Sequence, residues 1–140
     1  MACVRRQSLV LLTCVLMLCC VAAALGAAPD WPQFRGPNRD GKSPETGLLK
    51  EWPEGGPKLL WQIEGLGRGY STVSIAGGKI FTTGDRGQDG GEAQFVMAVD
   101  LATREELWAT RVGPPHRDGG PRSTPTVDGD LLYVIGTSGD

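Results

Sequence analysis

The stretch AVDLATREELW, from Ala98 to Trp108, decides the fold of this chain because it can be read in two ways. Thr103 and Glu106 have the spacing of a capping box, and leucine, arginine and glutamate are good helix formers. The same residues could equally join two short strands, FVMAVD (95–100) and EELWATRV (105–112), through a tight turn at LATR. The second reading makes the chain all-β.

An internal repeat favours the strand reading. STVSIAGGKIFTTGDRG (71–87) aligns with STPTVDGDLLYVIGTSG (123–139) at a constant offset of 52 residues, without a gap. LLWQIEG and ELWATRVG also correspond, which places Trp61 and Trp108 at an offset of 47 residues, with five extra residues in the loop GPPHRDGGPR. A period of about 50 residues that is rich in short strands is typical of β-propeller blades.

Each copy of the repeat carries a hairpin signal. Gly77-Gly78 and Asp128-Gly129 lie between β-rich runs, and both dipeptides readily adopt the positive φ of tight hairpin turns. We therefore predict an all-β fold of β-propeller blades, each a four-stranded antiparallel meander. Ala98–Trp108 is then a hairpin, with Trp108 buried on a strand. The predicted strands are 71–75, 80–84, 95–99, 106–112, 123–127 and 131–136.

Four residues of the opening stretch carry a resemblance to a known family. Ala98, Asp100, Thr103 and Trp108 match the tryptophan-docking motif of pyrroloquinoline-quinone-type (PQQ-like) β-propellers, whose form is Ala-x-Asp-x-x-Thr-Gly-x-x-x-Trp. Arg104 stands at the glycine position, where we expect a left-handed backbone at a cost of about 1 kcal/mol. The leader DWPQFRGPNRDG, together with EWPEGGPKLLW, is similar to the N-terminus of exported PQQ-like repeat proteins.

The resemblance implies a propeller of about seven or eight blades when complete. Trp61 and Trp108 would wedge between neighbouring blades, with Asp100 and Thr103 in the same docking motif, and LLWQIEG would be a strand that closes the ring. On this basis the chain holds roughly one and a half blades plus the closing strand. We expect it to be the N-terminal part of a longer protein, and residues 27–140 expressed alone to be poorly soluble or molten.

The first residues have the pattern of a secretory signal peptide. Arg5 and Arg6 precede an apolar run from Leu9 to Leu25, and small residues follow up to Gly26. We predict that residues 1–26 are the signal and that cleavage follows Gly26. Export to the periplasm or the exterior follows from this prediction.

Two alternatives to cleavage remain open. The apolar run is long enough to serve as an uncleaved membrane anchor, although its small residues favour cleavage. A lipoprotein signal is the other alternative, but Leu18 stands before Cys19 where a small residue is expected. After cleavage, residues 27–58 are a Pro/Gly-rich leader and residues 59–140 are the start of the propeller, with no stable membrane span.

Cysteine and charge content narrow the function classes. All four cysteines lie before residue 21, so the chain from Ala27 has no disulfide, thiol nucleophile or cysteine metal site. That part has 12 lysines and arginines against 16 aspartates and glutamates, because residues 1–26 hold two arginines and no acidic residue. The charges of both signs are dispersed with no basic stripe, which argues against a nucleic-acid partner.

Strand alternation predicts that the long loops and the tight turns lie at opposite ends of the meander. The long loops at 65–69, 85–94 and 113–122 fall at one end, and the turns at Gly77–Gly78, Asp128–Gly129 and LATR fall at the other. Variable loops on a rigid scaffold commonly carry binding sites. The candidate ligand-face residues are Arg68, Asp85, Arg86, Asp89, His116, Arg117, Asp118 and Arg122.

No residue of this chain can be assigned to catalysis, a cofactor or a metal from the sequence. His116, the single histidine, reads as a solvated loop residue, and Asp128-Gly129-Asp130 reads as a turn because the other positions of a calcium loop are missing. We therefore predict a non-catalytic binding or scaffold propeller of the cell envelope, with a protein or polymer partner. The alternative is a quinoprotein dehydrogenase for alcohols or sugars, which would require PQQ and calcium.

Sequencing of the mature N-terminus tests the predicted export. Protein isolated from the native cell envelope should begin near Ala27, because Ala24 and Gly26 supply the small residues that signal peptidase requires. Edman degradation or mass spectrometry of the terminal peptide measures this directly. A chain that begins at Met1 or at a lipidated cysteine would contradict the prediction.

Overall fold

The chain is all-β over residues 30–88 and 91–139, the residues that the computed structural model describes. These ranges contain no helix, and so none that could cross a membrane. The predicted signal peptide at 1–26 lies outside the described residues, as does Asp89. The described strands are β1 (Ser74–Ala76), β2 (Lys79–Gln88), β3 (Gly91–Asp100), β4 (Glu106–Gly113), β5 (Thr126–Asp128) and β6 (Leu131–Tyr133).

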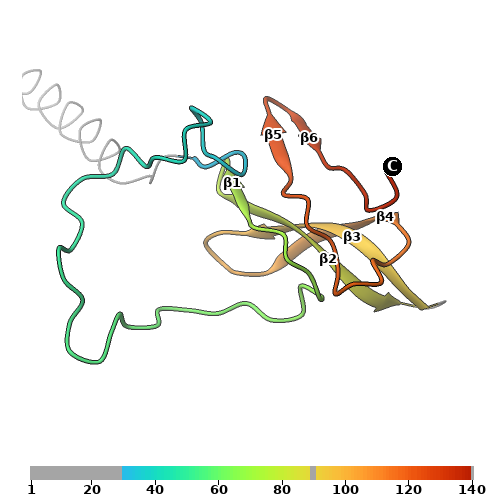
Figure 1. The fold of residues 1–140 in the computed structure, drawn as a ribbon, viewed down its shortest axis with the longest axis horizontal. Helices are drawn as coiled ribbons and strands as arrows, with labels where there is room; N and C mark the ends of the chain where they lie inside the picture. Colours follow the sequence, from blue (N-terminus) through green and yellow to red (C-terminus); the bar gives the residue numbers. More distant parts are fainter. Residues whose placement is uncertain (1–29, 89–90, 140) are drawn as a thin grey trace, which may run out of the picture.

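The strands form two antiparallel sheets (Figure 1). One is a four-stranded meander in the order β1-β2-β3-β4, and the other pairs β5 with β6. The predicted hairpin at Ala98–Trp108 is confirmed, since β3 ends at Asp100 and β4 begins at Glu106. Strands replace the helix here because β3 gains a hydrogen-bonded neighbour on each of its edges, which satisfies its backbone groups.

Asp100 shapes the turn between β3 and β4. Its Oδ1 atom accepts hydrogen bonds from the backbone N–H groups of Thr103 and Ala102, both at 2.8 Å. These bonds lower the pKa of Asp100 below its ordinary value, because they favour the ionised carboxylate. Thr103 Oγ1 accepts the Glu105 N–H at 3.3 Å. The aspartate and threonine of the motif therefore stabilise the turn locally.

Arg104 closes this turn in the left-handed conformation that the sequence predicts, with a φ of 70°. Its N–H donates to the Asp100 carbonyl at 2.9 Å. Its guanidinium carbon lies 4.2 Å from the centroid of the Trp61 ring, which is a close cation–π contact. This stacking offsets part of the cost of a non-glycine residue at positive φ.

The hairpin between β2 and β3 is longer than expected. The predicted loop at 85–94 is wrong for 85–88 and 91–94, because these residues lie on β2 and β3, which pair up to Gln88 opposite Gly91. Its glycines and acidic residues resemble a loop in sequence, but residues 93–99 are all buried and favour a continuous strand. Strand ends also differ elsewhere. β1 and β5 each begin three residues later than predicted, and β6 ends at Tyr133, three residues earlier.

The two faces of the four-stranded sheet contact different parts of the chain. On one face, Phe95 and Met97 belong to a buried cluster that packs against Leu66. Thr83 on β2 lies opposite Val96, which stands between Phe95 and Met97 on β3. Because side chains alternate between faces along a strand, Val96 and Thr83 point to the other face. There the Thr83 hydroxyl donates to the Ser123 carbonyl at 3.0 Å. The sheet therefore lies between the segment that precedes β1 and the second copy of the repeat.

The two candidate docking tryptophans are partly exposed. Trp108 lies on β4, as predicted, with its ring centroid 6.2 Å from that of Phe81. Its predicted burial is wrong, because 39% of Trp108 remains exposed. Trp61 is 45% exposed. The segment LLWQIEG around it forms no strand among the described residues, and its expected role as a closing strand stays a prediction. Strand formation requires pairing, and none of the described strands pairs with this segment.

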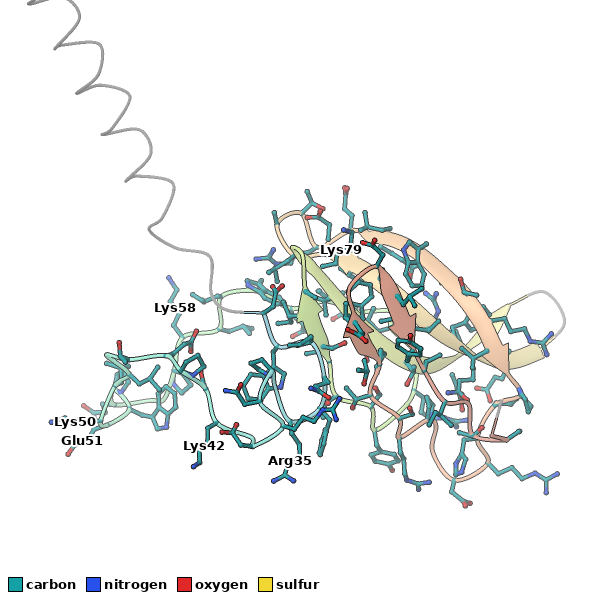
Figure 2. The ribbon with its side chains drawn as sticks, turned by 90° about the horizontal axis from the view of Figure 1, so that it is seen from above. Arg35, Lys42, Lys50, Glu51, Lys58 and Lys79 are labelled. Atoms are coloured by element: carbon teal, nitrogen blue, oxygen red, sulfur yellow. The ribbon has the colours of Figure 1, made fainter. Side chains whose placement is uncertain are left out.

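Residues 43–64 form a long excursion away from the sheet (Figure 1). They contain no strand, and Trp52 and Leu60 are exposed on them. Figure 2 shows Lys50 and Glu51 at the far tip of the excursion, away from the strands. The contact between Trp61 and Arg104 connects the end of this excursion to the turn between β3 and β4.

A double-mutant cycle tests the balance between strain and stacking at Arg104. Arg104→Gly removes about 1 kcal/mol of backbone strain but also loses a cation–π contact of about 0.5–1 kcal/mol. We expect little net change in the free energy of unfolding when Trp61 is present. In a Trp61→Ala background the same change should stabilise the protein by about 1 kcal/mol.

Chemical denaturation of the intact protein measures this coupling. Equal effects of Arg104→Gly in the two backgrounds would show that the stacking contributes nothing. Destabilisation in the Trp61→Ala background would show that the left-handed residue is not strained.

Candidate functional site at the long-loop end

Three segments that are distant in sequence meet at one end of the sheet. We name this region, formed by 65–70, by 113–122 and by the strand residues 84–88 and 91–94, the long-loop end. Arg68 and Asp85 form an isolated antiparallel bridge, with N–H to carbonyl distances of 2.9 and 2.8 Å. The Tyr70 N–H donates to the Pro121 carbonyl at 2.8 Å, which joins the first segment to the third.

The tight turns gather at another place, which we name the tight-turn end. The Leu101 N–H donates to the Gly78 carbonyl at 2.9 Å, so the turn after β3 contacts the turn after β1. The turn after β5 borders them across a cleft of about 420 Å³, whose lining includes Gly77, Gly129 and Trp108. Loops and turns are thus grouped as strand alternation predicts (Figure 1).

Glycines allow the backbones at the long-loop end to approach one another closely. A methyl group at Gly84 would overlap the backbone of the first segment, and so would one at Gly120. At Gly67, whose φ is 87°, a methyl group would lie 2.6 Å from the Asp85 carbonyl oxygen. Each of the three segments therefore contributes a glycine at which a larger residue does not fit.

Asp85 is the most buried of the charged candidates, at 3% exposure. Its Oδ2 atom accepts the His116 N–H at 2.9 Å, which ties the loop 113–122 to β2. Gln94 lies opposite Asp85 on β3, and its Oε1 accepts hydrogen bonds from the Thr137 N–H at 3.0 Å and hydroxyl at 3.2 Å. Asp85 Oδ1 and Gln94 Nε2 have no hydrogen-bond partner among the described residues. A buried acceptor and a buried donor therefore lie on neighbouring strands.

Arg122 is an exposed cation of the long-loop end. Its guanidinium carbon lies 5.5 Å from the centroid of the Tyr70 ring, and its Nη2 donates to the Asp118 carbonyl at 3.3 Å. Its Nη1 lies 3.5 Å from His116 Nε2, while His116 Nδ1 accepts the Asp118 N–H at 3.2 Å. None of these contacts is to a carboxylate. Within the described residues, the charge of Arg122 is thus oriented but not neutralised by an ion pair.

Two other arginines are already paired with carboxylates. Arg68 forms an exposed ion pair with Glu92, at 3.1 Å between Nη2 and Oε2. Arg86 has its Nη1 2.7 Å from Glu106 Oε2 and its guanidinium carbon 5.4 Å from the Phe95 ring centroid, and its Nη1 also donates to the Gly65 carbonyl at 3.4 Å. These contacts hold Arg86 across the sheet, so it is not presented for a ligand.

The structure therefore connects part of the predicted ligand face. The candidates linked by contacts are Arg68, Asp85, His116, Asp118 and Arg122. Arg117 is exposed on the same loop as His116, and Asp89 is outside the described residues. Arg86 contacts the Gly65 carbonyl at this end, but its charge is paired with Glu106. A role in ligand binding remains a prediction for all of them.

Sequence reasoning missed two residues that contact these candidates, Tyr70 and Gln94. Tyr70 precedes Arg122 by 52 residues, so extending the repeat alignment upstream of Ser71 would have placed the two together. Gln94 belongs to the stretch that was expected to be a loop, and nothing in the composition around it indicates burial. Its partner Thr137 becomes visible only in the folded chain.

The geometry of the long-loop end is suited to holding loops and presenting charge. Asp85 and His116 both accept backbone N–H groups with their side chains and so fix loop structure. In residues 30–88 and 91–139, no group of three or more His, Cys, Asp or Glu side chains is placed to hold a metal ion. The exposed guanidinium of Arg122 is able to bind a carboxylate, sulfate or phosphate group.

Comparison with known proteins gives no match to this chain among protein-family models, curated proteins or solved structures. Function is therefore inferred from the residues and their geometry. The internal repeat and the long-loop end are the features that bear on it.

Two glycines of β2 form a matched pair that tests the close approach at the long-loop end. Gly84→Ala should destabilise the protein by about 1–3 kcal/mol, because the new methyl group overlaps the neighbouring backbone. Gly87→Ala adds a methyl with nothing within 4 Å and should stay within about 0.5 kcal/mol of the parent. Denaturation of the intact protein measures both values, and equal effects would contradict the observed contact.

Proposed function

We propose that this chain forms the first blades of an exported PQQ-like β-propeller that acts as a non-catalytic binding or scaffold protein of the cell envelope. The four-stranded meander is one blade, and the β5–β6 hairpin begins the next. A protein or polymer partner docks at the long-loop end. The support comes from the relation between the two repeats and from the charges of the long-loop end.

Direct contact between equivalent residues of the two repeats is the observation that carries this proposal. Ser71 Oγ donates to the Ser123 carbonyl at 2.9 Å, and the hydroxyl oxygens of Thr72 and Thr124 lie 2.8 Å apart. Both pairs are separated by 52 residues, which is the offset of the repeat. The repeats therefore lie side by side with their chains running in the same sense.

The spacing between equivalent residues changes along the first strands. Thr72 and Thr124 touch, whereas the backbones of Ile75 and Val127 bond to the leader and not to each other. A translation would keep the separation of equivalent residues constant, whereas a rotation changes it with distance from the axis. Blades arranged around a central axis have this rotational relation.

Differences in exposure between equivalent side chains support the same arrangement. Phe81, which contacts Trp108, is 8% exposed, whereas its equivalent Tyr133 on β6 is 54% exposed. A second complete blade would cover Tyr133 in the way that Trp108 covers Phe81. The exposure of the Tyr133 ring on β6 is thus explained by the repeat, without a separate binding role.

The charges of the long-loop end favour a binding role with an anionic partner. Asp85 is buried and used to hold the His116 backbone, and Glu92 is paired with Arg68. Arg117 and Arg122 remain exposed and have no carboxylate partner among the described ion pairs. Positive charge is therefore available here, although the chain from residue 27 is acidic overall.

Binding of an anionic polymer tests the proposal, and alginate is a suitable probe. Arg122→Glu should weaken its binding to the intact protein by about tenfold, because a guanidinium is replaced by the charge of the ligand itself. Lys79→Glu, at the tight-turn end, makes the same change in net charge and should alter the affinity by less than about twofold. Calorimetry at constant ionic strength measures both, and equal losses would contradict docking at the long-loop end.

A separate assay tests the absence of catalysis. PQQ and calcium are added to the intact protein, and the reduction of an electron-accepting dye is followed with alcohols and sugars. The rate should not exceed that of the cofactors alone. A rate that depends on the protein would identify a dehydrogenase and overturn the non-catalytic proposal.

A further inference from the structure

The leader bonds to the first strands of both repeats at once. The Trp31 N–H donates to the Ile75 carbonyl at 2.8 Å, and the Trp31 carbonyl accepts the Ile75 N–H at 2.9 Å. The carbonyl of the next residue, Pro32, accepts the Val127 N–H at 2.8 Å. Ile75 and Val127 are equivalent residues of the repeat. Two consecutive leader residues therefore bond to the same position in each repeat.

These bonds use the open edges of β1 and β5. Among the described strands, β1 pairs only with β2, and β5 pairs only with β6. The leader thus lies between two strand edges that would otherwise have unpaired backbone groups. In Figure 1 the leader, drawn in blue, lies beside β1. In a propeller these edges of the first strands face the central axis.

The leader is held in this position by its own contacts. The Trp31 ring lies against Gly36, where a methyl group would come within 2.7 Å of the ring carbons. Gly36 is buried, has a φ of 74°, and donates its N–H to the Gln33 carbonyl at 3.0 Å. Asp30 Oδ2 accepts the Gly77 N–H at 3.2 Å, which anchors the leader at the tight-turn end.

We propose that the leader is a built-in stopper that closes the propeller axis at the tight-turn end. This inference rests on the propeller proposed above. The axis is then reached only from the long-loop end. On that side of the leader, Ser71, Thr72 and Thr124 carry hydroxyl groups near the contact between the repeats. The open part of the axis is therefore polar and suited to the hydroxyl or carboxylate groups of a ligand that enters from the long-loop end.

Hydrogen exchange in the intact protein tests where the leader sits. Gly36→Ala should displace Trp31 and raise the exchange rates of the Ile75 and Val127 amides by about tenfold or more, because the leader is their acceptor. Gly41→Ala is the matched control. Gly41 also has a positive φ, of 71°, but nothing lies within 4 Å of the added methyl group. It should leave both rates unchanged, and equal effects of the two variants would overturn the proposal.

The unmodified protein provides a second measurement that does not depend on how a variant folds. Ile75 and Val127 should exchange through one shared local opening, because a single segment protects both amides. The Tyr70 amide, which bonds to Pro121 at the long-loop end, should remain protected during that opening. Separate openings for Ile75 and Val127 would show that the leader does not bridge the repeats.

Access to the axis is tested with a single cysteine. After signal cleavage, Thr72→Cys would be the only cysteine of the described chain, and bound alginate should slow its alkylation by iodoacetamide. Gly36→Ala should restore alkylation by opening the tight-turn end, and Gly41→Ala should not. If Gly36→Ala does not restore alkylation, the proposal that the leader closes the axis is overturned. Failure of alginate to bind would count against the proposed function alone, since the exchange measurements still decide where the leader sits.

Discussion

Backbone contact between the equivalent segments 68–72 and 120–124 is the constraint on which the rest of the structure depends. The approach is close enough for the bond from Tyr70 to Pro121, and it requires that Gly120 have no side chain. Because protein interiors are close-packed, this contact sets the direction in which the second repeat leaves the sheet. It also gathers the long loops at one end and brings β1 and β5 close enough for the leader to bond to both.

Features that depend on local chemistry could be predicted from the sequence. The repeat and its turn dipeptides were enough to choose a hairpin for Ala98–Trp108, because turns and strands are specified by neighbouring residues. The motif was also enough to predict the left-handed backbone of Arg104. The meeting of the loops around Asp85 followed from strand alternation, which requires only sequential pairing.

Features that depend on tertiary neighbours could not be predicted. The strand residues 85–88 and 91–94 have a loop-like composition, and they form strands because they pair with each other. The exposure of Trp108 depends on what lies over it, and periodicity carries no information on that. Arg86 is drawn across the sheet by Glu106, and Trp31 pairs with Ile75. Both contacts join residues that no local pattern relates.

The leader is the first part of the described chain to be synthesised, yet its partners are made much later. The partner of Trp31 is Ile75, about 45 residues later in the chain, and the partner of Pro32 is Val127, about 95 residues later. The bonds of the leader therefore close long loops, which has an entropic cost. The edge of β1 is thus open while the second repeat is still being made, and during that interval another chain can compete for it. Both repeats are therefore needed before the leader can cover the open edges of β1 and β5.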